Sequence, residues 1–248
     1  MVRAKRFYVP GYVWHITHRC HNQEFLLRFD QDRRCWMYWL SQAKNRFSIS
    51  ILNYSITSNH VHLLAVNNSK ENSIAKSIHL AAGRTAQEFN KRKNRKGAFW
   101  EDRYHATAVE TGLHLLRCMV YIDTNMVRAG AVIHPREWAY CGYHELMGKK
   151  ARFNLIDDSK LSELIGLHAE QLKEKYESLI EEYLECKEWK RERRWTESLA
   201  IGSNIFVKRI KNDLCLRKRC QIIHKEKGIY VLDSVKNLSL KNGHKNRI

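Results

Sequence analysis

Hydrophobic and polar positions follow two different periods along the first part of the chain. Runs rich in β-branched and aromatic residues at 12–19, 49–56, 58–65 and 106–110 predict four strands. Apolar residues recur at helical spacing from Asp30, the expected N-cap, to position 47, and again from Asn72 or Ser73 onward. The order β-α-β-β-α-β predicts an α+β, ferredoxin-like (RRM-like) fold, an antiparallel sheet with helices on one face.

A further helix is predicted over residues 113–128, where Gly130 follows as the expected C-terminal stop. Its apolar arc should pack on the core, although Asp123 interrupts this arc without an evident reason. At ~100° per residue, a polar stripe within about 40° of Tyr121 is expected to face outward. The other members of this stripe are His114, Arg117, Asn125 and Arg128.

The pattern is weaker beyond Trp138. Residues 168–194 are expected to form a long charged helix, basic over 187–194, and 198–220 to form two shorter helices around Gly202. The lysine-rich segment 226–248 has little to bury. We therefore predict a first domain at 1–150 and an accessory, basic, helical extension at 151–248.

Charge and composition narrow the class of partner. A formal net charge of +18 and a pI near 9.7 predict a polyanionic partner, either nucleic acid or an anionic membrane surface. The sequence has no apolar run of about 18 residues and its N-terminus has no apolar signal core. The seven cysteines form no Cys-x-x-Cys pair, which favours a reducing compartment. We expect a cytoplasmic nucleic-acid-binding protein without a membrane association.

Two histidines mark the first candidate site. On a strand, side chains alternate between faces, so His60 and His62 should point the same way and form half of a metal site. A strand with two surface histidines explains this short pair equally well. His15, His18 and His105 also lie on or beside predicted strands, and we expect packing or DNA contact for them rather than metal ligation.

Cations and aromatic rings occur together at 91–104, as a single-stranded nucleic acid requires for its phosphates and unstacked bases. A solvated charged loop is the alternative interpretation. The DNA contacts should weaken with salt. The residues that we predict to bind DNA are Lys91, Arg92, Lys93, Arg95, Lys96, Trp100, Arg103 and Tyr104, together with Arg117 and Arg128 on the helix stripe.

Three motifs resemble those of the REP-associated tyrosine transposases, members of the HUH single-strand transposase superfamily. They are Ser-Asn-His-Val-His-Leu-Leu at 58–64, Phe-Trp-Glu-Asp-Arg-Tyr at 99–104 and the segment 121–130. The resemblance extends over about residues 6–150. Met126 is a departure, because many relatives have proline after the asparagine.

The resemblance implies a catalytic core in which His60 and His62 bind a divalent metal, Asn125 supplies a third ligand and Tyr121 is the nucleophile. The implied reaction is metal-dependent cleavage and rejoining of single-stranded or hairpin DNA from palindromic repeats, through a 5′-phosphotyrosine. Mg²⁺ or Mn²⁺ is the implied ion, although zinc would bind the histidines more tightly. Arg117 or Arg128 could favour the Tyr121 phenolate, or could simply face solvent. Members act as monomers or homodimers.

Two other functions fit the same residues. A domesticated, catalytically silent protein could retain the fold and charge and only bind DNA hairpins, and cleavage assays separate it from the transposase. A replication or conjugation initiator would use the same two-histidine chemistry. The sequence contains no Gly-x-x-x-x-Gly-Lys-Ser/Thr motif of the helicase that often accompanies such initiators.

Overall fold

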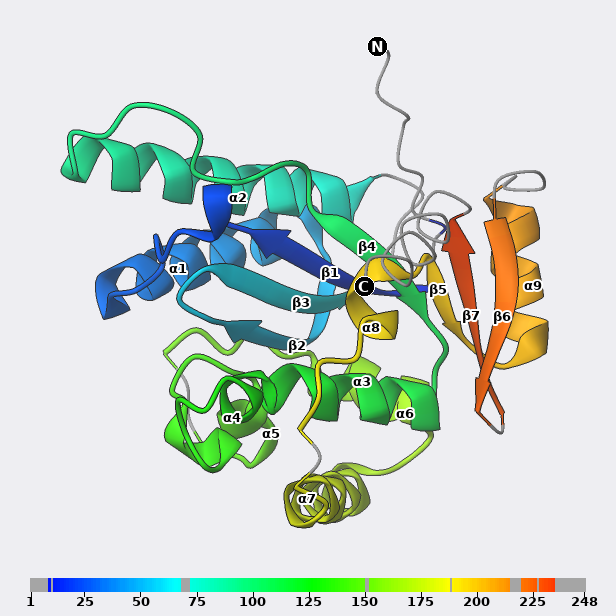
Figure 1. The fold of residues 1–248 in the computed structure, drawn as a ribbon. Coiled ribbons are helices and arrows are strands. Elements are labelled where there is room, and N and C mark those ends of the chain that lie inside the picture. The colour runs from blue at the N-terminus through cyan, green and yellow to red at the C-terminus, as the bar shows by residue number, and fades with distance from the viewer. Residues whose placement is uncertain are drawn as a thin grey trace, which may run out of the picture.

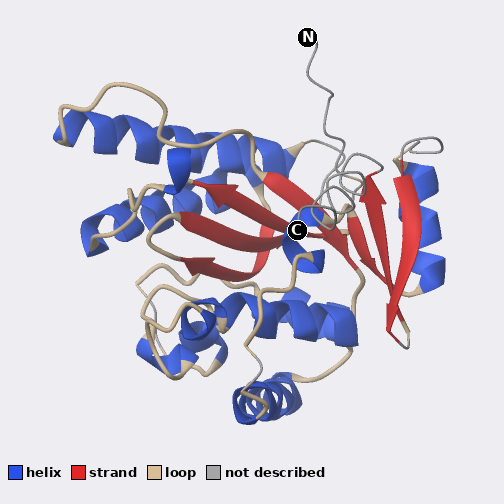
Figure 2. Cartoon of the chain, in the orientation of Figure 1, coloured by secondary structure: helices blue, strands red, loops and turns tan. Residues whose placement is uncertain are grey.

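A mixed sheet forms the centre of the molecule (Figures 1 and 2). The computed structural model describes residues 9, 11–67, 72–149, 152–187, 189–214, 220–226 and 228–234. Within these ranges the sheet has seven strands in the order β2-β3-β1-β4-β5-β7-β6. The strands are β1 (Val13–Arg19), β2 (Ser50–Ile56), β3 (His60–Val66), β4 (His105–Val109), β5 (Ala200–Gly202), β6 (Cys220–Glu226) and β7 (Ile229–Ser234).

The first four strands have the predicted ferredoxin-like topology. β1 lies between β3 and β4 and pairs antiparallel with both, and β2 pairs antiparallel with β3. The two crossovers are α1 (Asp30–Phe47) and α2 (Ser73–Arg92), which pack against each other on one face of the sheet. The α+β class and the β-α-β-β-α-β order are therefore confirmed. Asp30 is the first helical residue and Phe29 the N-cap, one position before the predicted cap.

The helices between β4 and β5 cover the opposite face of the sheet (Figure 1), whereas α9 packs on β5, β6 and β7. α3 contacts β2, α7 packs on α3, and α8 contacts β1 and β4. Because both faces are covered, β2 is buried along its whole length and β3 is buried after its first residue. The helices are α3 (Leu113–Asp123), α4 (Asn125–Arg128), α5 (Tyr143–Leu146), α6 (Asp158–Ile165), α7 (Ala169–Glu185), α8 (Arg194–Glu197) and α9 (Asn204–Asp213), with 3₁₀ turns η1 (His21–Gln23) and η2 (Pro135–Glu137).

The predicted helix at 113–128 is present as α3 and α4, separated at Thr124. At this break, the Thr124 hydroxyl donates to the Val120 carbonyl at 2.7 Å, so a side chain bonds to one of the helix's backbone acceptors. Gly130 has a φ of +68°, and its N–H donates to the Val127 carbonyl at 2.9 Å. This left-handed conformation confirms the expected C-terminal stop, since glycine adopts it without strain.

The prediction that the C-terminal region is only helical is wrong, because it also contributes three strands. In place of the two short helices expected around Gly202, the chain forms β5 and then α9. A Cβ added at Gly202 would lie 2.7 Å from Glu110 Cβ, so only glycine fits this close approach. β7 occupies part of the lysine-rich segment 226–248, whose residues 235–248 lie outside the described ranges.

The two predicted regions share one sheet. β5 pairs parallel with β4 at Ala108↔Ala200 and Val109↔Ile201, and β7 then pairs antiparallel with β5. The boundary predicted at residue 150 stays a prediction, and residues 150 and 151 lie outside the described ranges. In the described part of the chain, none of the helices has the length and apolarity needed to cross a membrane.

Candidate active site

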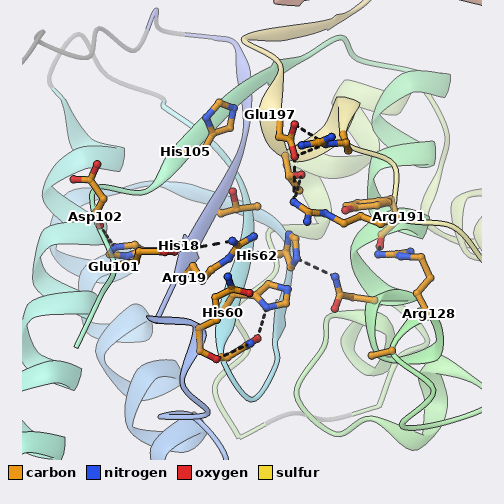
Figure 3. A pocket seen from close by; sticks show the side chains of 18 of the residues that line it. His18, Arg19, His60, His62, Glu101, Asp102, His105, Arg128, Arg191 and Glu197 are labelled. Carbon is orange, nitrogen blue, oxygen red and sulfur yellow. Dashed lines mark hydrogen bonds and ion pairs between the residues drawn. The ribbon is translucent and has the colours of Figure 1, made fainter. Parts of the chain in front are cut away.

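A pocket of about 650 Å³ opens where β1, β3, the start of α4 and the chain before α8 meet (Figure 3). His60 and His62 contribute their rings from β3, and Tyr121 and Asn125 line the same pocket from α3 and α4. The fold therefore brings together four residues from two segments that lie far apart in the sequence. His18, Arg19, Glu101, Asp102, Arg103, His105, Arg128, Arg191, Arg193 and Glu197 also line this pocket.

His60 and His62 lie close together, with ring centroids 4.9 Å apart and planes at 76°. His62 is 1% exposed and His60 is half-buried at the start of β3. Burial lowers the pKa of His60 to about 4 and lowers the pKa of His62 well below its ordinary value. Both rings are therefore neutral at neutral pH, and neutral imidazole is the form that binds a metal.

A hydrogen bond at the turn before β3 fixes the protonated nitrogen of His60. His60 Nδ1 lies 2.7 Å from Asn59 Oδ1, and Asn59 Nδ2 donates to the Gln23 carbonyl at 3.2 Å. Because the amide nitrogen of Asn59 already points at a carbonyl, its oxygen accepts the proton of His60 Nδ1. His60 Nε2 consequently keeps its lone pair.

Tyr121 and Asn125 lie one helical turn apart beside His62. The Tyr121 ring is 6.0 Å from the His62 ring at 84°, and Asn125 Nδ2 lies 3.0 Å from His62 Nε2. Tyr121 is only 3% exposed, so the expected outward-facing stripe is wrong at this position. The cause is the C-terminal chain, where the Trp195 ring lies 6.0 Å from the Tyr121 ring.

Arg128 is held against Tyr121. Its guanidinium carbon lies 4.0 Å from the centroid of the Tyr121 ring, and Nη2 donates to the Tyr121 carbonyl at 2.6 Å. Nη1 donates to Thr124 Oγ1 at 2.7 Å. Burial raises the pKa of Tyr121, while the positive charges of Arg128 and Arg191 act in the opposite direction. These two arginines are the groups that favour the phenolate in an otherwise desolvated position.

The predicted DNA-binding residues divide into two groups. Arg103 and Arg128 line the pocket, whereas Arg117 is exposed on α3 outside it. At the end of α2, Lys91, Lys93 and Lys96 are exposed on the surface. These three lysines form the second group and extend the positive surface beyond the pocket.

Several members of the predicted set also have protein partners. Arg92 pairs with Asp32, and Arg95 Nη2 lies 3.7 Å from Glu24 Oε1. Trp100 stacks on His18 with ring centroids 4.2 Å apart. Tyr104, half-buried, lies edge-on to His18 at 6.1 Å. The Trp100 face that contacts His18 is thus not available to a base.

Arg191 and Arg193 are pocket residues that the sequence places only within a generally basic run. Arg193 Nε donates to Glu197 Oε1 at 2.8 Å, and Arg191 Nη2 lies 3.4 Å from the same oxygen. Figure 3 shows Arg191 and Arg128 on the same side of His62. Their position depends on contacts between α8 and the sheet, and no local pattern in the sequence carries that information.

The donor set limits how a metal could be bound. Within the described residues, no group of three or more His, Cys, Asp or Glu side chains could hold a metal ion. A site here would combine two imidazoles with an amide or with oxygens of the substrate. Asn125 presents its nitrogen to His62, so ligation through Oδ1 requires a half-turn of the amide.

Comparison with known proteins finds a family model that matches the part of the chain holding most of this site. Residues 8–125 match the family model described as "Transposase IS200 like". This part of the chain is similar to the IS200-like transposases. The match includes His60, His62, Tyr121 and Asn125, and it ends before Arg128 and the C-terminal chain that covers Tyr121. No curated protein matches the chain.

Two solved structures are similar to this chain. One is a REP-associated tyrosine transposase bound to a REP hairpin, at 17% identity and a TM-score of 0.48, covering 60% of this chain and 86% of that chain. The other is named as a transposase from Deinococcus radiodurans, at 15% identity and a TM-score of 0.33, covering 42% of this chain and 84% of that chain. Both scores are under 0.5, so the similarity to the IS200-like transposases rests on the sequence match.

Proposed function

We propose that this protein is a metal-dependent DNA endonuclease and strand transferase that acts on single-stranded or hairpin DNA, with Tyr121 as the nucleophile. The supporting observation is that Tyr121, His60, His62 and Asn125 line one pocket although they come from separate elements. A chain that only binds DNA has no need to bury a tyrosine beside two neutral histidines. The net charge of +18 suits a polyanionic substrate.

The chemistry that we propose uses the Tyr121 hydroxyl. Its proton leaves, its oxygen forms a bond to phosphorus, and the bond from phosphorus to the 3′-oxygen breaks. The 3′-oxygen takes up a proton and the 5′-phosphate stays on the tyrosine. Attack by a 3′-hydroxyl reverses these bonds and rejoins DNA. Arg128, 4.0 Å from the Tyr121 ring, supports the first step because its charge favours the phenolate.

The residues present fit a divalent ion. His60 has a free Nε2 lone pair, His62 Nε2 faces Asn125 at 3.0 Å, and Asn125 can offer its oxygen after rotation. We propose that these three residues hold Mg²⁺ or Mn²⁺. When bound, the ion would polarise the scissile phosphate and neutralise the charge that develops on it. The arginines around the pocket would hold the flanking phosphates.

The proposed substrate class follows from the sequence resemblance and the charge distribution. Arg19, Arg103, Arg191 and Arg193 line the pocket with Arg128, and lysines continue the positive surface at the end of α2. Phosphates of a single strand could follow this path while a hairpin stem remains outside the pocket. Palindromic repeats of the kind implied by the resemblance are the substrates that we propose.

Cleavage of a labelled hairpin oligonucleotide with a single-stranded flank tests the proposal. We expect a protein-linked DNA band on a denaturing gel in Mg²⁺ or Mn²⁺, and its loss in Tyr121→Phe. Tyr38→Phe is the matched control, because Tyr38 is 44% exposed on α1 and does not line the pocket. Cleavage that persists in Tyr121→Phe would show that another group is the nucleophile. Binding without a linked band across several hairpins would favour the catalytically silent hairpin-binding protein.

A further inference from the structure

His15 lies behind the candidate metal ligands, on the neighbouring strand β1. It is 0% exposed and has hydrogen-bond contacts at both ring nitrogens. Nδ1 is 2.8 Å from the Trp195 carbonyl oxygen, and Nε2 is 2.9 Å from His62 Nδ1. The His15 and His62 rings stack with centroids 5.1 Å apart and planes at 16°. His15 therefore connects the backbone of α8 to a candidate metal ligand.

The protons on the His15 and His62 rings can be placed because a carbonyl oxygen can only accept a hydrogen bond. The Trp195 carbonyl accepts, so His15 Nδ1 carries the proton of that bond. In a neutral ring, the form that burial favours, His15 Nε2 is then the acceptor and His62 Nδ1 donates to it. His62 must keep its lone pair on Nε2. That atom points toward Asn125 at the pocket.

We propose that His15 is a positioning residue that fixes the tautomer and orientation of His62, with the Trp195 carbonyl as its anchor. This inference rests on the proposed function, because His62 is taken as a metal ligand. The outer hydrogen bond of a ligating histidine commonly sets its ring orientation and tautomer. Here the outer partner is a second histidine, whose own direction is set by a backbone carbonyl.

The anchor comes from outside the family match, which ends at residue 125. Thr107 on β4 donates to the Trp195 carbonyl at 3.2 Å and to the Ser198 carbonyl at 2.7 Å, which holds α8 against the sheet. The Trp195 ring also lies 6.0 Å from Tyr121. The C-terminal region thus completes the candidate site from behind, through buried contacts.

The first test reads the tautomer directly in metal-free protein. ¹⁵N NMR of histidine side chains distinguishes a proton on Nδ1 from one on Nε2. We expect His62 to be protonated on Nδ1 in the wild type and to lose this preference in His15→Phe, which removes both hydrogen bonds. His15→Gln should retain it, because an amide also offers one donor and one acceptor. An Nε2 proton on His62 in the wild type would overturn the proposal.

The second test measures binding of Mn²⁺ alone by electron paramagnetic resonance. We expect His15→Phe to weaken Mn²⁺ binding about 10- to 100-fold and His15→Gln to restore most of the loss. Thr107→Val is the matched control, since it removes a bond to the same Trp195 carbonyl, and one to the Ser198 carbonyl, without removing a partner of His62. If Thr107→Val weakened Mn²⁺ binding as much as His15→Phe, the effect would be a general loosening of α8 and the proposal would fail.

The two tests also separate this proposal from the proposed function. If the wild type binds Mn²⁺ and shows the predicted tautomer but forms no DNA-linked product, the nuclease proposal fails and His15 keeps its role. If DNA is cleaved while His15→Phe leaves both the tautomer and Mn²⁺ affinity unchanged, the positioning role fails and the nuclease proposal remains.

Discussion

Asp123 provides a stability prediction that can be worked out from its surroundings. Its side chain is 0% exposed, and the Tyr176 hydroxyl donates to Oδ2 at 2.5 Å. This bond joins α3, which carries Tyr121, to α7 of the C-terminal region. Burial raises the pKa of Asp123 from 3.8 to about 7, with the hydrogen bond from Tyr176 opposing the shift. The residue that interrupts the apolar arc of α3 is thus a buried inter-helix contact.

The sign of the pH effect follows from proton binding. Between its unfolded pKa and its folded pKa, Asp123 is protonated in the folded state and ionised in the unfolded state. The stabilising contribution of protonated Asp123 is therefore fully present below about pH 4 and is lost as the pH rises to about 7. A shift of about 3 pH units, at ~1.4 kcal/mol per unit, corresponds to a loss of about 4 kcal/mol. Asp123→Asn cannot titrate and should not show this loss.

Urea unfolding of the wild type and Asp123→Asn over this pH range measures the difference. Between about pH 4 and pH 8, we expect the free energy of unfolding of the wild type to fall by about 4 kcal/mol relative to that of the variant. The other titratable groups are the same in both proteins, so their contributions cancel in this difference. Tyr176→Phe should destabilise by about 1–3 kcal/mol because it removes a buried donor. Parallel pH profiles for wild type and Asp123→Asn would refute the argument, since they would mean that Asp123 is ionised in the folded state.

Two further predictions concern the arginines of the pocket. Arg128→Gln removes the positive charge over the Tyr121 ring, so the pKa of Tyr121 should rise. The rate of formation of DNA-linked product, measured against pH, should then shift to higher pH. An unchanged profile would exclude a role for Arg128 in favouring the phenolate. Arg191→Ala should weaken hairpin binding and reduce the slope of log K against log salt by about 1, if Arg191 contacts one phosphate. Arg117→Ala, an exposed arginine outside the pocket, is the comparison for a general loss of charge.

Local periodicity carries the information for the first half of the fold. Strand and helix periods differ, so α1 and the core strands can be located from short windows of sequence. The same reasoning places His60 and His62 on one strand, and Tyr121 and Asn125 one helical turn apart. Gly130 marks the helix end for an equally local reason, since glycine alone tolerates its left-handed conformation at no cost.

Contacts between segments that are distant in the sequence decide the rest of the fold and the surroundings of the candidate site. β5 has only three residues, too few to show a period, and it becomes a strand because β4 and β7 lie on either side of it. Tyr121 is buried because the ring of Trp195, a residue far away in the sequence, packs beside it. The anchor of His15 is a backbone carbonyl, a group that every residue possesses and that therefore leaves no mark in the sequence. Spacing within an element can be predicted from its own residues, whereas burial and the outer partners of the site required the tertiary structure.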